Sequence, residues 1–69
     1  MPKIHGIYLD ILFNQKYVVI EVVDANSYVK AVWLSSDGIL DPINSEFPTS
    51  AMNNDIYCGQ ASELMVALL

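Results

Sequence analysis

Cys58 and His5 carry the strongest intrinsic chemistry in this sequence of 69 residues. A cysteine thiol and a histidine can act together as a nucleophile and its base. No third residue at a telling spacing would orient such a pair, and a lone cysteine is commonly a small buried apolar residue. We therefore predict no catalytic residue, and we expect Cys58 in the core and His5 at the frayed or exposed start of a strand.

Paired carboxylates are the other candidate chemistry, because two of them can hold a cation or act as acid and base. Four acids lie in the polar connection of the chain: Asp37, Asp41, Glu46 and Asp55. Their spacings match no calcium loop, and aspartate in "SDG" and "DP" is ordinary turn chemistry. The three glycines are isolated and form no phosphate-binding loop. Because His5 and Cys58 also lack zinc-finger spacing, we predict neither a metal nor a cofactor.

The charge balance excludes a further class of function. The chain has three Lys, no Arg and eight acidic residues, for a net charge of −5. Nucleic-acid binding normally needs a basic surface, with Arg for bidentate contacts to phosphate or guanine. The acids are spread singly, which is typical of a surface that keeps a small apolar protein in solution and not of nucleic-acid mimicry. We expect no nucleic-acid partner.

A chain of this length predicts one domain, 1–69, with a thin core. Apolar residues make up 54% of the chain, and such small domains usually depend on disulfides, a metal or a partner subunit. One cysteine allows no internal disulfide. The N-terminal stretch is a poor signal peptide, and the apolar run "LMVALL" is far too short for a membrane helix. We expect a cytoplasmic protein with a partner subunit and no membrane contact.

The first half of the chain alternates in the way that β-strands do. Residues 4–13, 17–23 and 28–34 are rich in β-branched and aromatic side chains. A two-residue loop at 14–15 would pair Ile11 with Val18, and a four-residue loop at 24–27 would pair Glu21 with Lys30. Both registers place apolar faces together, whereas a slip of one residue would mix them. The pattern predicts an antiparallel meander.

The second half has weaker signals. Turn residues recur through 35–54, where we expect at least one short element, such as an edge strand near 38–40. Tyr57, Ala61, Leu64, Met65 and Leu68 form one helical stripe, which favours a helix capped by Asn54. Gly59 leaves a second interpretation open, in which residues 55–58 form a strand and the helix begins at Ser62.

These elements predict an α+β fold, a small antiparallel β-meander of three to four strands packed on a C-terminal helix, with a small closed β-barrel as the alternative. One face of the sheet is almost wholly apolar and should meet the helix. It comprises Ile7, Leu9, Ile11, Val18, Ile20, Val22, Val29 and Trp33. The other face is still largely apolar, and such a patch usually marks an interaction surface. We therefore predict a homodimer whose interface is formed by Tyr8, Tyr17, Val19, Tyr28 and Val32.

No motif in the chain carries a reaction, so association is the function that the pattern favours. We expect a small non-enzymatic protein acting through protein–protein contacts, as a homo-oligomer or as an inhibitor or adaptor of a heterologous protein. Its short, Arg-free, acidic composition resembles that of small accessory proteins of phage and mobile elements, and this resemblance is one of composition alone. The alternative is a small-molecule-binding domain or enzyme with a pocket at a subunit interface.

Overall fold

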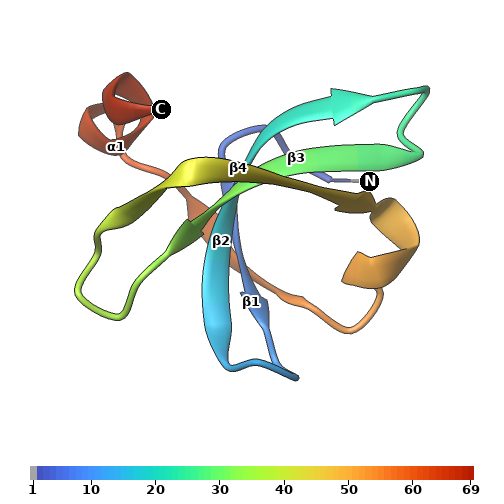
Figure 1. Ribbon diagram of the computed structural model, residues 1–69, viewed down its shortest axis with the longest axis horizontal. Coiled ribbons are helices and arrows are strands. Elements are labelled where there is room, and N and C mark those ends of the chain that lie inside the picture. The colour runs from blue at the N-terminus through green and yellow to red at the C-terminus, as the bar shows by residue number, and fades with distance from the viewer. Residues whose placement is uncertain (1) are drawn as a thin grey trace.

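The computed structural model describes residues 2–69, which form one twisted antiparallel sheet of five strands and a short helix (Figure 1). The strands lie side by side in the order β4-β3-β2-β1-β5. The elements are β1 (Gly6–Asp10), β2 (Gln15–Val23), β3 (Tyr28–Leu34), β4 (Leu40–Pro48), the 3₁₀ helix η1 (Thr49–Met52), β5 (Ile56–Gln60) and α1 (Glu63–Leu68). The fold is therefore α+β with an antiparallel meander, as predicted, but it has five strands, and the sheet is not closed into a barrel.

The turn between β1 and β2 is longer than the sequence predicts. It spans residues 11–14, and β1 pairs with β2 as Ile7 with Val18 and Leu9 with Lys16. The carboxylate of Asp10 explains the difference, because it accepts hydrogen bonds from the backbone N–H groups of Leu12 and Phe13 at 3.0 and 3.3 Å. Local bonds of this kind stabilise a turn in place of the strand ladder. The predicted pairing of Ile11 with Val18 is wrong, and the first strand ends at Asp10.

A bulge in β2 decides which of its side chains share a face with those of β3. The predicted loop at 24–27 and the pair of Glu21 with Lys30 are confirmed, but the register shifts between Val19 and Glu21. Beyond that shift Val19 faces Ala31, and Tyr17 faces Trp33. One extra residue in a strand exchanges the two faces from that point on. Tyr17 and Val19 therefore share a face with the inward side of β3.

The main core cluster lies on this aromatic face, so Tyr8, Tyr17 and Val19 were wrongly predicted to face outward, whereas Val18, predicted inward, is also buried, on the other side of the sheet. The central cluster comprises Tyr8, Tyr17, Val19, Val29 and Ala31, and Trp33, Phe47 and Met52 pack against it. The Tyr17 ring stacks on Tyr8 and meets the edges of Trp33 and Phe47, with ring centroids 5.2–5.8 Å apart. Trp33 does face the core, as predicted. The sheet curls around this cluster, which supplies the burial that a helix was expected to give.

The second half of the chain contains more strand than predicted. The expected element in residues 35–54 exists, and it is the whole of β4 with η1 after it. The preferred long helix from Asn54 is wrong, since residues 56–60 form β5 against β1. The helix begins after Ser62, whose side chain accepts a hydrogen bond from Met65 N–H. Gly59 has φ +109°, a backbone conformation that a helix does not contain.

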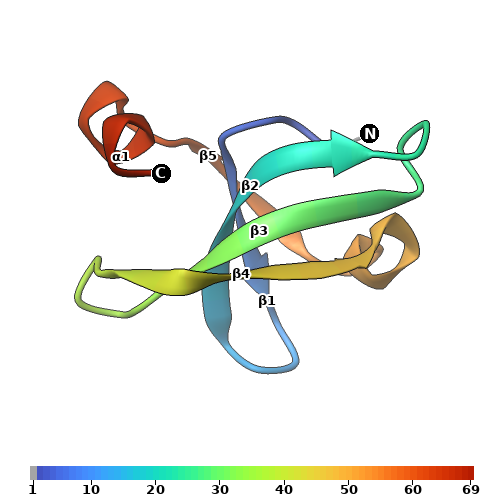
Figure 2. The ribbon, with the colours of Figure 1, turned by 45° about the horizontal axis from the view of Figure 1, so that its top comes forward.

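The short helix α1 lies on the side of the sheet opposite to the aromatic core. Val32, which is buried on that side, lines a cleft together with Leu64, Met65 and Leu68 of α1. No residue of α1 is itself buried. Two views show α1 at the same end of the molecule as the β3–β4 turn, with η1 at the other end (Figures 1 and 2).

By register Val32 shares the side of α1 with Val18 and Ile7, which were predicted to meet the helix, whereas Val29 and Trp33 of β3, predicted to do so too, lie on the other side. The predicted helix-covered face is therefore right for these residues of β1 and β2 and wrong for β3, and the short helix covers it in part.

Candidate functional site: an apolar surface beside the β3–β4 turn

The five residues predicted to form an interface lie mostly inside the chain. Tyr8, Tyr17, Val19 and Val32 are buried, and Tyr28 alone is exposed. The first three belong to the aromatic core, and Val32 lies on the opposite face of the sheet. The structure does not bring the five together on one surface. A single chain does not test a homodimer, so the dimer remains a prediction, but its contact surface has to be sought elsewhere.

The residues with candidate chemistry do not converge either. Cys58 was expected in the core and is exposed, with its Sγ 3.3 Å from the carbonyl oxygen of Ile56. Asp41 Oδ1 accepts from the N–H of Ile43 at 2.9 Å, which is turn chemistry as the sequence suggests. Among residues 2–69 no group of three or more His, Cys, Asp or Glu side chains could hold a metal ion. The structure gives these residues no common site.

Asp55 is a carboxylate that bonds the side chain of a buried residue. Its Oδ2 accepts a 2.5 Å hydrogen bond from the hydroxyl of Tyr17, whose side chain is 1% exposed. Burial, followed by this hydrogen bond and the nearby negative charge, raises the pKa of Tyr17 well above its ordinary value. A phenol with a raised pKa stays protonated at neutral pH, so Tyr17 acts as a hydrogen-bond donor and an anchor.

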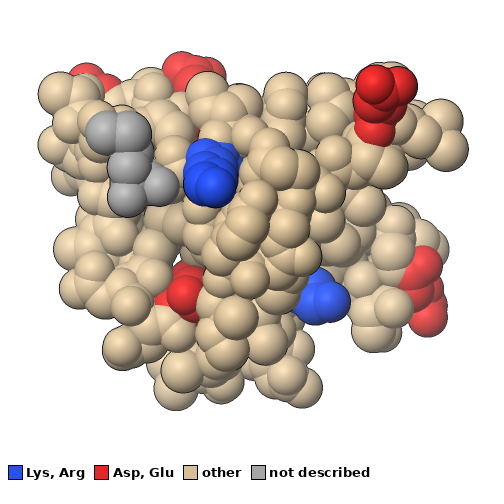
Figure 3. Space-filling model, turned by 180° about the vertical axis from the view of Figure 1, so that it is seen from behind, with Lys and Arg blue, Asp and Glu red and all other residues tan. Residues whose placement is uncertain are grey.

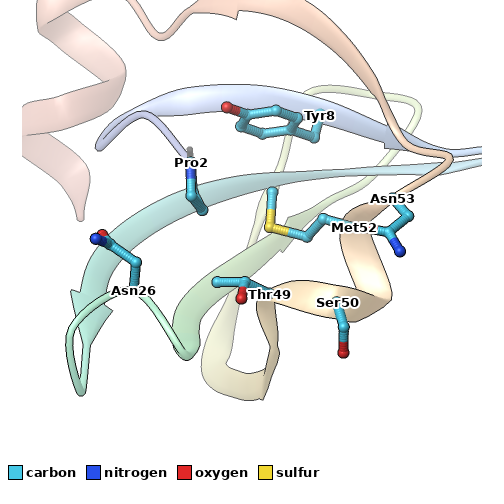
Figure 4. Close-up of a pocket in the computed structure, with 7 residues that line it drawn as sticks. All are labelled: Pro2, Tyr8, Asn26, Thr49, Ser50, Met52 and Asn53. Atoms are coloured by element: carbon cyan, nitrogen blue, oxygen red, sulfur yellow. The ribbon is translucent and has the colours of Figure 1, made fainter.

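A cleft of about 490 Å³ lies beside η1 (Figure 4). Met52 points into it toward Tyr8, while Asn26, Ser50 and Asn53 lie around its rim. These polar side chains come from different elements and do not point toward one common place in the cleft (Figure 4). Small-molecule sites usually combine an apolar lining with a few converging polar groups. This cleft lacks that convergence and gives the ligand-binding alternative little support.

Both edges of the sheet are protected against pairing with another strand. The edge strand β4 contains Asp41, Pro42, Glu46 and Pro48. The other edge strand, β5, has five residues and a register irregularity opposite Ile7 and Tyr8. Charges, proline, bulges and short length are the features by which natural sheets avoid edge-to-edge association. Any association is therefore expected to use side-chain surfaces rather than strand edges.

Two neighbouring clefts bring several of the exposed apolar residues together. The α1 cleft, of about 690 Å³, lies between α1 and the start of β4, and its apolar lining includes Val32, Ile39, Leu40, Leu64, Met65 and Leu68. The Phe13 cleft, of about 770 Å³, lies on the other side of the β3–β4 turn and is more polar: its lining comprises Leu9, Phe13, Leu34 and Gly38 with Asn14, Gln15, Lys16, Ser35 and Ser36. Gly38 lines both clefts, and Leu34 and Leu40 are cross-strand partners. We call this continuous region the two-cleft surface.

The side chains on the two-cleft surface are unusually open to solvent. Leu64 and Leu68 of α1 are 77% and 74% exposed, and Phe13 is 70% exposed. The charged residues that line it are Lys16 at one end and Asp41 at the other. Isolated charges among uncharged residues are also visible from behind the molecule (Figure 3). Contiguous apolar patches rimmed by charge are typical of protein-binding surfaces.

Sequence reasoning missed this surface because it assigned the helical stripe to the core. Leu64, Met65 and Leu68 were read as the buried side of a long helix, and Phe13 as part of a strand. The signal that could have corrected this is Ser62, which suits an N-cap position and favours a helix that begins there rather than at Asn54. A helix of six residues cannot bury a full stripe and expose a polar face.

No helix among residues 2–69 is long and apolar enough to cross a membrane. No protein-family model, curated protein or solved structure matches this chain.

Proposed function

We propose that this chain is a small non-enzymatic protein that acts through protein–protein contacts, and that it makes those contacts with the two-cleft surface. The observation that carries the proposal is the exposure of Leu64 and Leu68 on α1, a helix that buries none of its residues. When a partner covers exposed leucines, the removal of their apolar area from water stabilises the complex by about 25 cal/mol per Å². A partner surface is the simplest account of this arrangement.

The blandest alternative is that α1 is only a loosely attached end of the chain. Two features argue against it. Ser62 caps α1, which organises the helix at its start. The cleft wall opposite α1 is also apolar, because Ile39 and Leu40 face the same space. An exposed apolar wall on both sides is what a bound side chain would need.

The test compares two double variants with the same added charge. Leu64→Asp/Leu68→Asp places two acids in the α1 cleft, and Ile4→Asp/Tyr28→Asp places two acids on exposed apolar residues that line neither cleft. Circular dichroism first establishes that both variants fold. Self-association is then measured by sedimentation, and binding to proteins of the source cells by quantitative affinity capture.

The proposal expects the first variant to lose the bound protein, whether a second copy or another chain, and the control to retain it. Equal recovery with the two variants would show that the α1 cleft is not the contact surface. If both variants retain as much bound protein as the wild type does, the proposed function loses its basis.

A further inference from the structure

We propose that the partner on the two-cleft surface is a second copy of this chain, related by a two-fold axis that passes near Gly38. In this arrangement Phe13 of each copy enters the α1 cleft of the other. The inference rests on the proposed function, because it names the occupant of the same surface. It adds the two-fold symmetry of the contact and two pairs between copies, Phe13 with the α1 cleft and Lys16 with Asp41.

The shape of the surface suits a two-fold axis. The two clefts flank the β3–β4 turn and meet at Gly38. A rotation of 180° about that place exchanges the ends, so that the Phe13 end of one copy lies on the α1 end of the other. Phe13 projects from the β1–β2 turn and is 70% exposed, while the α1 cleft is an open space of about 690 Å³ with leucine walls. A self-complementary surface of this kind defines an isologous contact, which closes at two copies.

The charges on the surface fit the same register. Lys16 lies with Phe13 in one cleft, and Asp41 lies with the leucines of α1 in the other. Within residues 2–69 the ion pair is Glu21 with Lys30, so Lys16 has no acidic partner of its own. The two-fold axis places Lys16 of each copy near Asp41 of the other, and two opposite-charge pairs result. Complementary charges of this kind fix the register of an interface.

The size of the chain also allows a dimer on this surface. A standard interface buries about 800 Å² on each partner, and the chain exposes 4603 Å². One face of the molecule is therefore enough. Since both sheet edges are protected by prolines, charges or a bulge, a second copy has no strand edge that competes with this surface.

The first experiment measures the dimer dissociation constant by sedimentation velocity over a range of micromolar concentrations. Phe13→Ala removes the side chain that enters the α1 cleft, and we expect it to raise the dissociation constant about tenfold or more, as for a central aromatic anchor. Leu12→Ala is the matched control, because Leu12 is the adjacent residue of the same turn, is 83% exposed and lines neither cleft. We expect Leu12→Ala to leave the constant unchanged.

The second experiment tests the register by exchanging charges between copies. In a homodimer of Lys16→Glu, the introduced glutamate of each copy faces Asp41 of the other, so both pairs repel. In a homodimer of Asp41→Lys both pairs consist of two lysines and also repel. Each variant is therefore expected to dimerise about tenfold or more weakly than wild type. A mixture of the two single variants forms a heterodimer in which Glu faces Lys in one pair and Asp faces Lys in the other. The mixture is therefore expected to recover dimers near the wild-type level, with both variants folded by circular dichroism.

Asp37 gives an independent check on the position of the axis. It lies in the turn next to Gly38, so the axis brings the two Asp37 side chains toward each other. Asp37→Asn is expected to tighten the dimer by about two- to fivefold. A dimer that weakens with Asp37→Asn contradicts an axis at this turn.

The outcomes separate this inference from the proposed function. A protein that stays monomeric at every concentration overturns the second copy as partner, and loss of another bound protein with Leu64→Asp/Leu68→Asp would then still support the proposed function. A dimer that ignores Phe13→Ala, or whose single charge variants are not rescued by mixing, overturns the two-fold register. Recovery on mixing with selective weakening by Phe13→Ala supports the whole inference.

Discussion

The hydroxyl of Tyr17 donates a 2.5 Å hydrogen bond to Oδ2 of Asp55, and this bond ties the centre of the sheet to the segment that leads into β5. Tyr17 is also the ring on which Tyr8, Trp33 and Phe47 pack. One side chain thus joins four strands through aromatic contacts and holds the chain between η1 and β5 through its polar tip. Tyrosine suits this position because its body is apolar and its hydroxyl can reach a partner.

Replacing Tyr17 by Phe should test the hydrogen bond without emptying the core. Tyr17→Phe keeps the ring and removes the donor to Asp55, so the free energy of unfolding is expected to fall by about 1.5–3 kcal/mol, as for hydrogen bonds to charged groups. Urea denaturation measures the change. Tyr57→Phe is the control, since its hydroxyl bonds Gln60 at the surface and its loss should cost less than about 0.5 kcal/mol. Equal effects of the two changes would mean that the Asp55 bond adds nothing.

Alkaline pH should destabilise the fold through the same residue. Burial and the bond to Asp55 raise the pKa of Tyr17, whereas an unfolded tyrosine ionises near pH 10. The unfolded state therefore releases a proton that the folded state keeps, so this contribution to stability is complete below about pH 10 and falls as the pH rises further. Unfolding free energies of wild type and Tyr17→Phe from pH 8 to 11 should show a shallower decline in the variant. Parallel declines would exclude Tyr17 as the source.

Trp33 should contribute strongly to the stability of the core. Its ring packs at 5.4 Å from that of Tyr17, and its Nε1–H donates to Ser45 Oγ at 3.1 Å. Trp33→Ala removes both contacts and leaves a cavity, so we expect a loss of about 3 kcal/mol, which a small domain can scarcely tolerate. Thermal melting followed by circular dichroism measures it, with Tyr28→Ala as an exposed aromatic control. A melting temperature within a few degrees of wild type would show that the ring adds little to the core.

The turn between β2 and β3 offers a stabilising change. Asp24, Ala25 and Asn26 all have positive φ, with Ala25 at +53°. Asp and Asn tolerate that conformation better than Ala does, whereas Gly adopts it without steric cost. Ala25→Gly should raise the free energy of unfolding by about 0.5 kcal/mol, the relief of strain exceeding the added freedom of the unfolded chain. A drop in stability, measured in urea, would mean that Ala25 is unstrained there.

The pair of Glu21 and Lys30 should show weak coupling. Lys30 Nζ lies 3.7 Å from Glu21 Oε1, and both side chains are exposed to solvent. Exposed pairs across strands contribute about 0.2–1 kcal/mol and are screened by salt. A double-mutant cycle of Glu21→Gln and Lys30→Gln should give a coupling in this range at low salt that shrinks in 0.5 M NaCl. Zero coupling at low salt would show that the contact has no energetic value.

The sequence predicted the local features whose causes are local. The alternation of residues 28–34 gave the third strand with its observed bounds, and the turn chemistry of 24–27 gave the register of Glu21 with Lys30. The burial of Val29 and the inward side of Trp33 followed from that strand. These predictions were correct because a strand alternates with period two and a short turn fixes its register through neighbouring residues.

The candidate surface could not be read from the pattern in the same way. Leu64 and Leu68 have the spacing of a buried helical stripe, and nothing local states that β5 would take residues 56–60 and shorten the helix. The strand forms because β1 offers an unpaired edge, which is a tertiary interaction. Shortening of the helix then leaves the leucines exposed.

The composition by itself determined that the chain is short, acidic and rich in β-forming residues, and this was enough for an antiparallel α+β fold with a thin core. The tertiary structure decided which residues are inside. Both faces of β2 are apolar, and Val18 is buried as well as Tyr17 and Val19, so hydrophobicity could not tell which residues of β2 share a face with Trp33. The bulge between Val19 and Glu21 made the choice, because it aligns Tyr17 with Trp33 and lets the aromatic rings close around one another.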